Sequence, residues 1–202
     1  MAVEDVFLPF AIPRERVPVS THIRSTWVGS SLQAVRERGL LDRYLALLPE
    51  EHRAPILDTV AGVWLPMEVG VAHYRACDGL GLSKRETWDI GVHVTRKVHG
   101  TTLGLAVRLA KQGGVSPWTV LAQLQRLWDR IYLGGGVAVY RKGPKEAIVD
   151  IAGWPLAPIG YVRQTMPAVA QGVVEMFCQK AYISEVSAPA QRNSFGLKLQ
   201  WV

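Results

Sequence analysis

Two residues in the middle of the chain have the types and the spacing of metal ligands. His73 and Cys77 are four positions apart, so on a helix their side chains lie on one face. A metal site needs further ligands, and no CxxC or HxxxH pattern stands nearby to supply them. We therefore predict no metal site here, with Cys77 packed in the core and His73 partly exposed.

A lone histidine, His99, has the surroundings of a haem axial ligand. It ends a helical pattern that starts at Ser83 and falls inside the apolar arc of that pattern, whereas His93 falls outside. A histidine on an apolar face can ligate haem iron, but it is more often a hydrogen-bonded core residue. We predict no cofactor, and haem or another hydrophobic ligand is the alternative.

Motifs for catalysis or phosphate binding are missing from the sequence. It has no G-x-S-x-G elbow and no G-x-G-x-x-G after a strand. Its one close pair of carboxylates, Glu50 and Glu51, is typical of a solvated helix start and not of a catalytic pair. The triple glycine at 134–136 leads from a helix into a strand, and no Gly-Lys-Ser/Thr follows it. A phosphate loop has the opposite order, with its glycines before a helix. These absences favour a binding protein over an enzyme.

The composition is typical of a globular intracellular domain. The 202 residues are 49% hydrophobic, enough for a sizeable core, and the two cysteines suit a reducing cytoplasm. Pro9, Pro13 and Pro18 interrupt the N-terminus, which excludes a signal peptide. No apolar run approaches the roughly 18 residues of a membrane helix. We predict a cytoplasmic protein with no membrane span.

Nucleic acid is a further partner that a net charge of +6 would suit. The segment 81–100 resembles a recognition helix after a tight turn, with Lys84 and Arg85 at one end and Arg96 and Lys97 near the other. Its apolar arc covers about half of the circumference, and an acidic residue lies in the narrow polar stripe that remains. A buried helix with a solvated edge is the simpler interpretation, so we predict no nucleic-acid partner.

The elements that must position these residues form an α+β pattern. Apolar residues at helical spacing predict helices over 23–38, 40–48, 50–60, 66–79, 83–99, 101–111, about 117–131 and about 161–177. Alternating apolar residues predict two hairpins, over 137–152 and 181–202. We expect an extended arm over 1–20 and a single domain over 21–202. In that domain helices cover one face of a small antiparallel sheet of about four strands.

Several segments resemble a known family. The stretch RLWDRIYLGGGVAVYRKGPKEAIVDIAGWP, the helix YVRQTMPAVAQGVVEMFCQ and the ending SFGLKLQWV are similar to bacterial vinyl-reductase-type small-ligand-binding domains, most of all to single-domain paralogues of myxobacteria. The likeness extends over about residues 25–202. It implies the fold of haem nitric-oxide sensor domains and of Golgi transport-particle subunits. It also implies a small or hydrophobic ligand between helices and sheet, and a homodimer paired through helices.

The chain departs from that family at one position. Many relatives carry Gly-x-x-x-Cys-x-Phe/Tyr near the end of the domain, whereas this chain has no cysteine between Asn193 and Leu197. A metal or thiol role that depends on that cysteine is in doubt for this chain.

Pro167 suggests where a pocket would form. Because proline cannot donate to the carbonyl of Arg163, a helix through it is expected to kink and open a cavity. Alternatively, Thr165 caps a new helix with Pro167 in its first turn, and then no kink exists. Inward-facing positions supply the candidate lining residues, which suit plain core equally well: Tyr74, Trp88, Val92, His99, Trp128, Tyr161 and Met166.

The sequence thus predicts a non-enzymatic ligand-binding or sensory module of a bacterial signalling system. Its hydrophobic pocket is expected between helices and sheet. The alternative is a ligand-free, dimerising scaffold that binds another protein through a helical face or the N-terminal arm.

Overall fold

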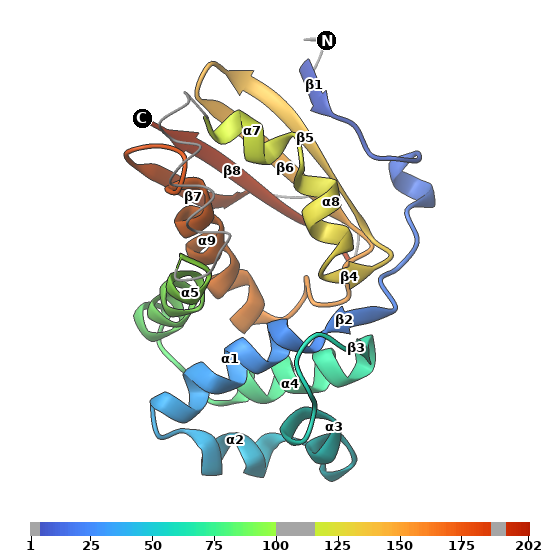
Figure 1. The fold of residues 1–202 in the computed structure, drawn as a ribbon, viewed down its shortest axis with the longest axis vertical. Coiled ribbons are helices and arrows are strands. Elements are labelled where there is room, and N and C mark those ends of the chain that lie inside the picture. The colour runs from blue at the N-terminus through green and yellow to red at the C-terminus, as the bar shows by residue number, and fades with distance from the viewer. Residues whose placement is uncertain (1–4, 100–115, 187–192) are drawn as a thin grey trace.

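The computed structural model describes residues 5–99, 116–186 and 193–202, with side chains omitted at 96–99. Its first half is helical (Figure 1). The elements there are α1 (Ser25–Glu37), α2 (Leu41–Leu47), the 3-10 turn η2 (Glu50–His52), α3 (Arg53–Leu57), α4 (Met67–Gly79) and α5 (Lys84–His99). They lie where helices were expected between 23 and 99, except that the helix expected over 50–60 is divided into η2 and α3 and ends at Leu57. The helix expected over 101–111 lies outside the described residues.

The second half builds an antiparallel sheet, which confirms the α+β prediction. Its strands, in spatial order, are β1 (Asp5–Leu8), β5 (Gly136–Gly143), β6 (Glu146–Ala152), β8 (Phe195–Trp201) and β7 (Ala181–Val186). The expected sheet of about four strands gains a fifth because Val6 of the N-terminal segment pairs with Tyr140 of β5. In β8 the alternating residues from Phe195 to Trp201 are buried, as their period of two predicts.

A second, three-stranded sheet joins the two halves, and the sequence patterns did not predict it. Its central strand, β2 (His22–Arg24), lies between β3 (Trp64–Pro66) and β4 (Tyr132–Leu133). These strands have three residues or fewer, too short for an alternating pattern. Ile23, expected to start the first helix, is instead a fully buried strand residue between Leu65 and Tyr132.

Local chemistry explains where the longest helix of the first half begins. Ser83 and Glu86 form the capping box that their spacing predicts: the Ser83 backbone N–H donates to Glu86 Oε2 at 2.8 Å, and the Glu86 N–H donates to Ser83 Oγ at 3.3 Å. The hydrogen bonds from Ser83 lower the pKa of the Glu86 carboxyl. The helix that begins here, α5, packs beside α9 (Figure 1).

Two predicted helices have different bounds in the structure. The helix expected from Pro117 is divided into α7 (Pro117–Leu121) and α8 (Leu124–Asp129). In contrast, α9 (Gly160–Val174) is continuous through Pro167. The Thr165 hydroxyl donates to the Tyr161 carbonyl at 2.9 Å, so it does not cap a new helix, and that alternative is wrong.

The N-terminal segment is held against the sheet by two sets of contacts. Arg14, in the 3-10 turn η1 (Arg14–Arg16), donates to Asp150 of β6 through Nε at 2.6 Å and Nη2 at 3.0 Å. Beyond it, the chain at 18–20 crosses Gly134 and Gly153, both of which have positive φ. A Cβ at Gly153 would lie 2.4 Å from the Pro18 carbonyl oxygen. A Cβ at Gly134 would lie 2.9 Å from the Val19 carbonyl oxygen, so Gly134 and Gly153 both allow the backbone at 18–20 to lie close to them.

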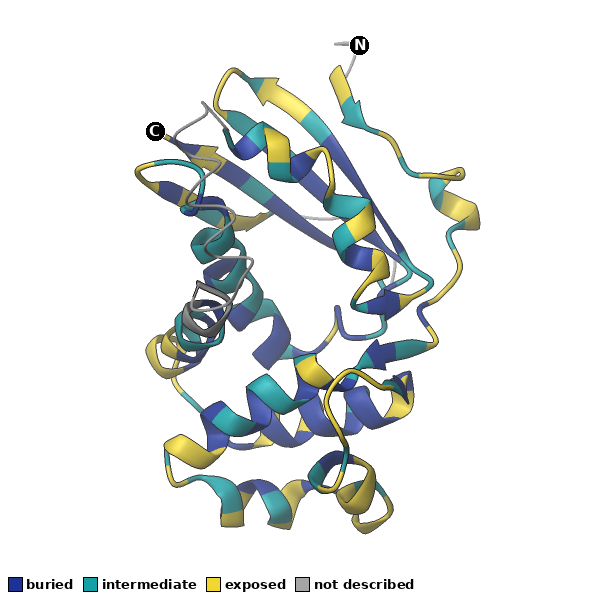
Figure 2. Ribbon diagram, in the orientation of Figure 1, coloured by how far each residue is buried: buried dark blue, intermediate teal, exposed yellow. Residues whose placement is uncertain are grey.

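The core is continuous between the helical half and the sheet. Residues of α1, α4, α9, β5, β6 and β8 belong to one cluster of buried side chains, and each of these elements carries buried residues in Figure 2. Its largest fully buried side chains are Trp154, Tyr44 and Phe195. Trp154 lies in the connection between β6 and α9, so this core joins the two halves.

Candidate functional site

A cavity of about 30 Å³ lies between the helices and the connection that follows β6. Its walls come from α1, α4, α5, α9 and that connection, and most of its lining is apolar. The lining residues are Trp27, Ser31, Tyr74, Ile90, Gly91, Val94, Trp154, Leu156, Tyr161, Val162, Thr165, Met166 and Val169.

Small residues set the distance between the two helices that form one wall. A Cβ at Gly91 of α5 would lie 2.7 Å from both Ala168 Cβ and the Thr165 carbonyl oxygen of α9. A Cβ at Gly172 of α9 would lie 2.5 Å from Thr95 Cγ2. Both glycines therefore allow a close backbone approach that a larger residue would prevent, and Gly91 itself lines the cavity.

The cavity wall carries a pair of hydroxyl groups. Ser31 Oγ of α1 and Tyr161 Oη of α9 lie 3.3 Å apart, and both residues are buried. The Tyr161 backbone N–H also donates to Asp78 Oδ1 at 2.5 Å, which places a carboxylate at the positive end of α9. Burial raises the pKa of the Tyr161 phenol, so the hydroxyl stays protonated and neutral.

A second buried polar group lies behind this wall. Tyr44 Oη is 2.7 Å from His73 Nδ1, and His73 Nε2 is 3.7 Å from Cys77 Sγ. Burial lowers the pKa of His73 to about 3 and raises the pKa of the Cys77 thiol to about 12, so both are neutral. The predicted partly exposed His73 is wrong, because Tyr44 from α2 supplies the hydrogen bond that lets the imidazole be fully buried.

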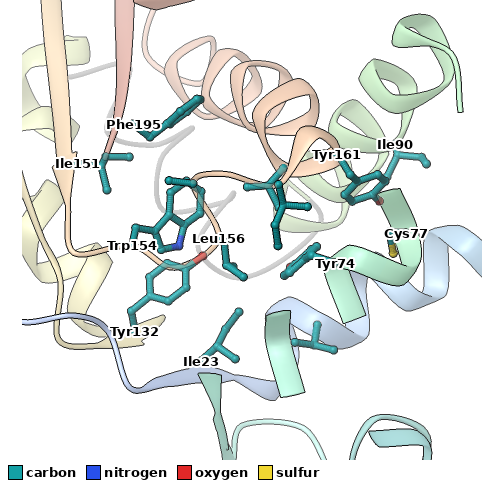
Figure 3. Close-up of a cluster of buried hydrophobic side chains, with 14 of the residues drawn as sticks. Ile23, Tyr74, Cys77, Ile90, Tyr132, Ile151, Trp154, Leu156, Tyr161 and Phe195 are labelled. Atoms are coloured by element: carbon teal, nitrogen blue, oxygen red, sulfur yellow. The ribbon is translucent and has the colours of Figure 1, made fainter. Parts of the chain in front are cut away.

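On the sheet side the cavity ends at an aromatic cluster (Figure 3). The ring centroid of Trp154 lies 5.8 Å from those of Trp128 and Phe195 and 6.0 Å from that of Tyr132. Trp128 also packs on Tyr132 at 4.4 Å and donates its indole N–H to the Gly134 carbonyl at 2.9 Å. These rings fill the space between the cavity and the sheet.

The structure brings together three of the seven predicted lining residues: Tyr74, Tyr161 and Met166. Trp128 lies behind Trp154 in the aromatic cluster. Trp88 and Val92 are half-buried on α5 and are not among the residues that line the cavity. The side chain of His99 lies outside the described part of the chain.

Other lining residues were missed, and one of them had a usable signal. Ile90 is 1% exposed and points inward, so the buried face of α5 is rotated relative to the arc drawn through Trp88 and Val92. Including Ile90 in the helical pattern would have placed that face correctly. Trp154 and Leu156 lie in a connection without periodicity, so no spacing could have assigned them to a wall.

A larger groove of about 340 Å³ lies on the outer side of α1, facing α3 and the loop after it. It is lined by apolar and polar groups in similar measure, including Ile56, Leu57, Val60, Gln33 and Arg36. None of the predicted pocket residues lines it.

The arrangement of helices, sheet and enclosed core corresponds to a known class of sensor domain, the H-NOX fold. The Fe(II) unliganded H-NOX protein from K. algicida matches with a TM-score of 0.60 at 10% identity, covering 89% of this chain and 97% of that chain. A variant of T. Tengcongensis H-NOX matches with a TM-score of 0.56 at 9% identity, over 89% and 97% of the two chains.

A third matching structure was described in connection with how protein-induced porphyrin distortion modulates haem redox potential. It has a TM-score of 0.55 at 8% identity, covering 89% of this chain and 100% of that chain. No protein-family model and no curated protein sequence matches. The fold is therefore the haem nitric-oxide sensor fold implied by the sequence resemblance, at identities that establish the fold alone.

The described residues do not fit a haem. The cavity of about 30 Å³ is an order of magnitude below the roughly 300–1,000 Å³ of a typical cofactor pocket. Of the imidazoles described, His73 is hydrogen-bonded in the core, His93 Nε2 lies 2.8 Å from Glu37 Oε2, and none lines the cavity. Across the described ranges, no three His, Cys, Asp or Glu residues are grouped to hold a metal, and no helix could cross a membrane.

Proposed function

We propose that this chain is a non-enzymatic sensory module that binds a ligand much smaller than haem. The cavity between α1, α4, α5 and α9 carries this proposal, because it lies inside the sensor fold and combines an apolar lining with a buried hydroxyl pair. A pocket of this kind binds through apolar contact and is oriented by few polar groups. The volume of about 30 Å³ limits an occupant to a few non-hydrogen atoms.

The cellular setting belongs to the same proposal. We infer a homodimer in a bacterial signalling system, in keeping with the family that the sequence resembles. Burial makes the Cys77 thiol unreactive, which suits a reducing cytoplasm.

Mass spectrometry and absorption test whether a ligand is retained. The purified protein is measured under native and denaturing conditions, and its spectrum is recorded between 350 and 450 nm (about the Soret range). Extra mass under native conditions without a Soret band supports the proposal. A Soret band that disappears in His99→Ala would contradict it and assign haem.

Xenon tests the cavity directly, because the gas binds apolar cavities without needing a polar partner. We expect saturable xenon-induced NMR shifts at the methyl groups of Val162 and Val169. Val94→Phe should abolish them, since the larger ring enters the cavity. Val63→Phe is the matched control, because Val63 is exposed and is not among the lining residues. Thermal melting verifies that both variants fold. Equal xenon binding by both variants would show that the cavity is misplaced.

A second candidate function, the ligand-free scaffold, is favoured by the groove outside α1. Its volume of about 340 Å³ exceeds that of the cavity, and Val60 at its rim is 67% exposed. A helical segment of a partner protein could pack there. A protein that carries no extra native mass, shows no xenon shifts and loses a copurifying partner on Val60→Glu would support the scaffold.

A further inference from the structure

Among the described residues, two adjacent buried polar groups have no hydrogen-bond partner: Trp154 on the cavity wall and Tyr132, which packs against it. Trp154 is fully buried and Tyr132 is 2% exposed, yet neither Trp154 Nε1 nor Tyr132 Oη makes a hydrogen bond of acceptable geometry. The two groups lie next to each other in Figure 3. The neighbouring Trp128 shows the ordinary situation, because its indole N–H has the Gly134 carbonyl as acceptor.

The pair is short of one acceptor however its atoms are oriented. The indole supplies one N–H donor, and the phenol supplies one O–H donor and one acceptor oxygen. Trp154 Nε1 lies within reach of Tyr132 Oη, and if it donates there, the O–H of Tyr132 still has no acceptor among the described residues. Burial raises the pKa of this phenol, so the proton remains on it.

The missing acceptor has to be neutral and small. Trp154 lines the cavity, and no Asp, Glu, Lys or Arg is among the lining residues, so an anionic acceptor would be buried there without a countercharge. The other hydroxyl groups on the wall are already engaged: Ser31 with Tyr161, and Thr165 with the Tyr161 carbonyl.

We propose that the cavity binds a small neutral molecule with one hydrogen-bond acceptor, such as a nitrile or carbonyl compound, which accepts a hydrogen bond from the Tyr132–Trp154 pair. The inference rests on the proposed ligand-binding function and specifies the chemical class of the ligand. The apolar part of such a molecule lies against Ile90 and Leu156.

Acetonitrile and propyne are the probes, because they have the same linear shape and differ in one acceptor atom. The indole N–H resonance of Trp154 is followed by NMR and assigned with Trp154→Phe. Acetonitrile should shift it downfield saturably, while propyne should bind without that shift. Tyr132→Phe should weaken acetonitrile binding about three- to tenfold and leave propyne binding unchanged.

The outcomes separate this inference from the proposed function. Equal shifts with both probes, or xenon binding without binding of acetonitrile, would overturn the inference and leave the cavity function standing. If the wild-type protein bound neither acetonitrile nor xenon, both the inference and the proposed function would be wrong. An internal water on Trp154 Nε1 that acetonitrile does not displace would likewise overturn the inference. Each of the variants Trp154→Phe and Tyr132→Phe serves as a test only if it binds xenon as tightly as the wild-type protein does. Equal xenon binding shows that the cavity has kept its shape.

Discussion

At the scale of single residues, the least expected feature is a histidine that is buried and neutral. His73 is fully buried, and its two ring nitrogens face Tyr44 Oη and Cys77 Sγ. With Tyr44 donating to Nδ1, the imidazole keeps its proton on Nε2 and directs it at the sulfur. The i,i+4 pair on α4, which has the spacing of metal ligands, therefore belongs to a closed hydrogen-bonded network.

This burial predicts a pH dependence of stability. The pKa of His73 falls from its ordinary 6.5 to about 3 on folding, because burial disfavours the imidazolium. Between these values the unfolded chain binds a proton that the folded protein does not. The free energy of unfolding should therefore decrease as the pH falls below about 6.5, by up to ~1.4 kcal/mol per pH unit from this group.

Urea unfolding at pH 7.5, 6.5, 5.5 and 4.5 (about the titration window) measures that slope. His73→Gln can still accept a hydrogen bond from Tyr44 but does not titrate, so its stability should vary less with pH over this range. Equal slopes for the two proteins would mean that His73 titrates normally and is not the source.

At the scale of elements, the contact between α5 and α9 determines whether the cavity exists. Gly91 and Gly172 permit this close approach, and the side chains of Ile90, Val94 and Met166 line the cavity beside it. Leu156 and Trp154 close the side toward the sheet.

Glycine substitutions test this packing. Gly172→Ala places a methyl group 2.5 Å from Thr95 Cγ2, so the helices must separate, and we expect a loss of about 1–3 kcal/mol. Gly29→Ala on α1 is the control, because no atom lies within 4 Å of the position that its methyl group would take, and alanine favours a helix interior. That variant should gain up to about 1 kcal/mol. Chemical unfolding measures both, and equal changes would contradict the packing argument.

At the scale of the whole molecule, the N-terminal segment is a structural part of the sheet. β1 forms one edge of the five-stranded sheet, and Arg14 makes a bidentate ion pair with Asp150 of β6. The side chain of Arg14 is 19% exposed and that of Asp150 is 12% exposed. Ser194 accepts a further hydrogen bond from the same guanidinium at 3.1 Å.

Removing this ion pair should release the segment. Arg14→Gln leaves the Asp150 carboxylate largely buried without its partner, so we expect a loss of about 2–3 kcal/mol. Hydrogen exchange at Val6 and Leu8 should accelerate, since β1 loses its anchor. Lys198→Gln removes the same charge from a more exposed pair with Glu146 and should cost at most about 1 kcal/mol. Equal exchange in both variants would show that Arg14 does not hold the arm.

The sequence predicted those parts of the molecule whose structure depends on residues close together in the chain. The capping box at Ser83, the hairpin from β5 to β6 and the alternation of β8 follow from spacing within one element, and the structure confirms them. The parts it missed depend on distant segments. β1 and β2 are too short to show a period, and Trp154 gains its place only through rings from β4, α8 and β8.

The three-stranded sheet constrains the order in which the chain can acquire its structure during synthesis. β2, at residues 22–24, needs β4 at 132–133 as one of its two neighbours. A ribosome adds roughly 5–20 residues per second, so the emerging helical half must wait several seconds or more for that strand. During this delay the apolar side chain of Ile23 lacks Tyr132 on one side, so β2 completes its native pairing only after β4 has been synthesised.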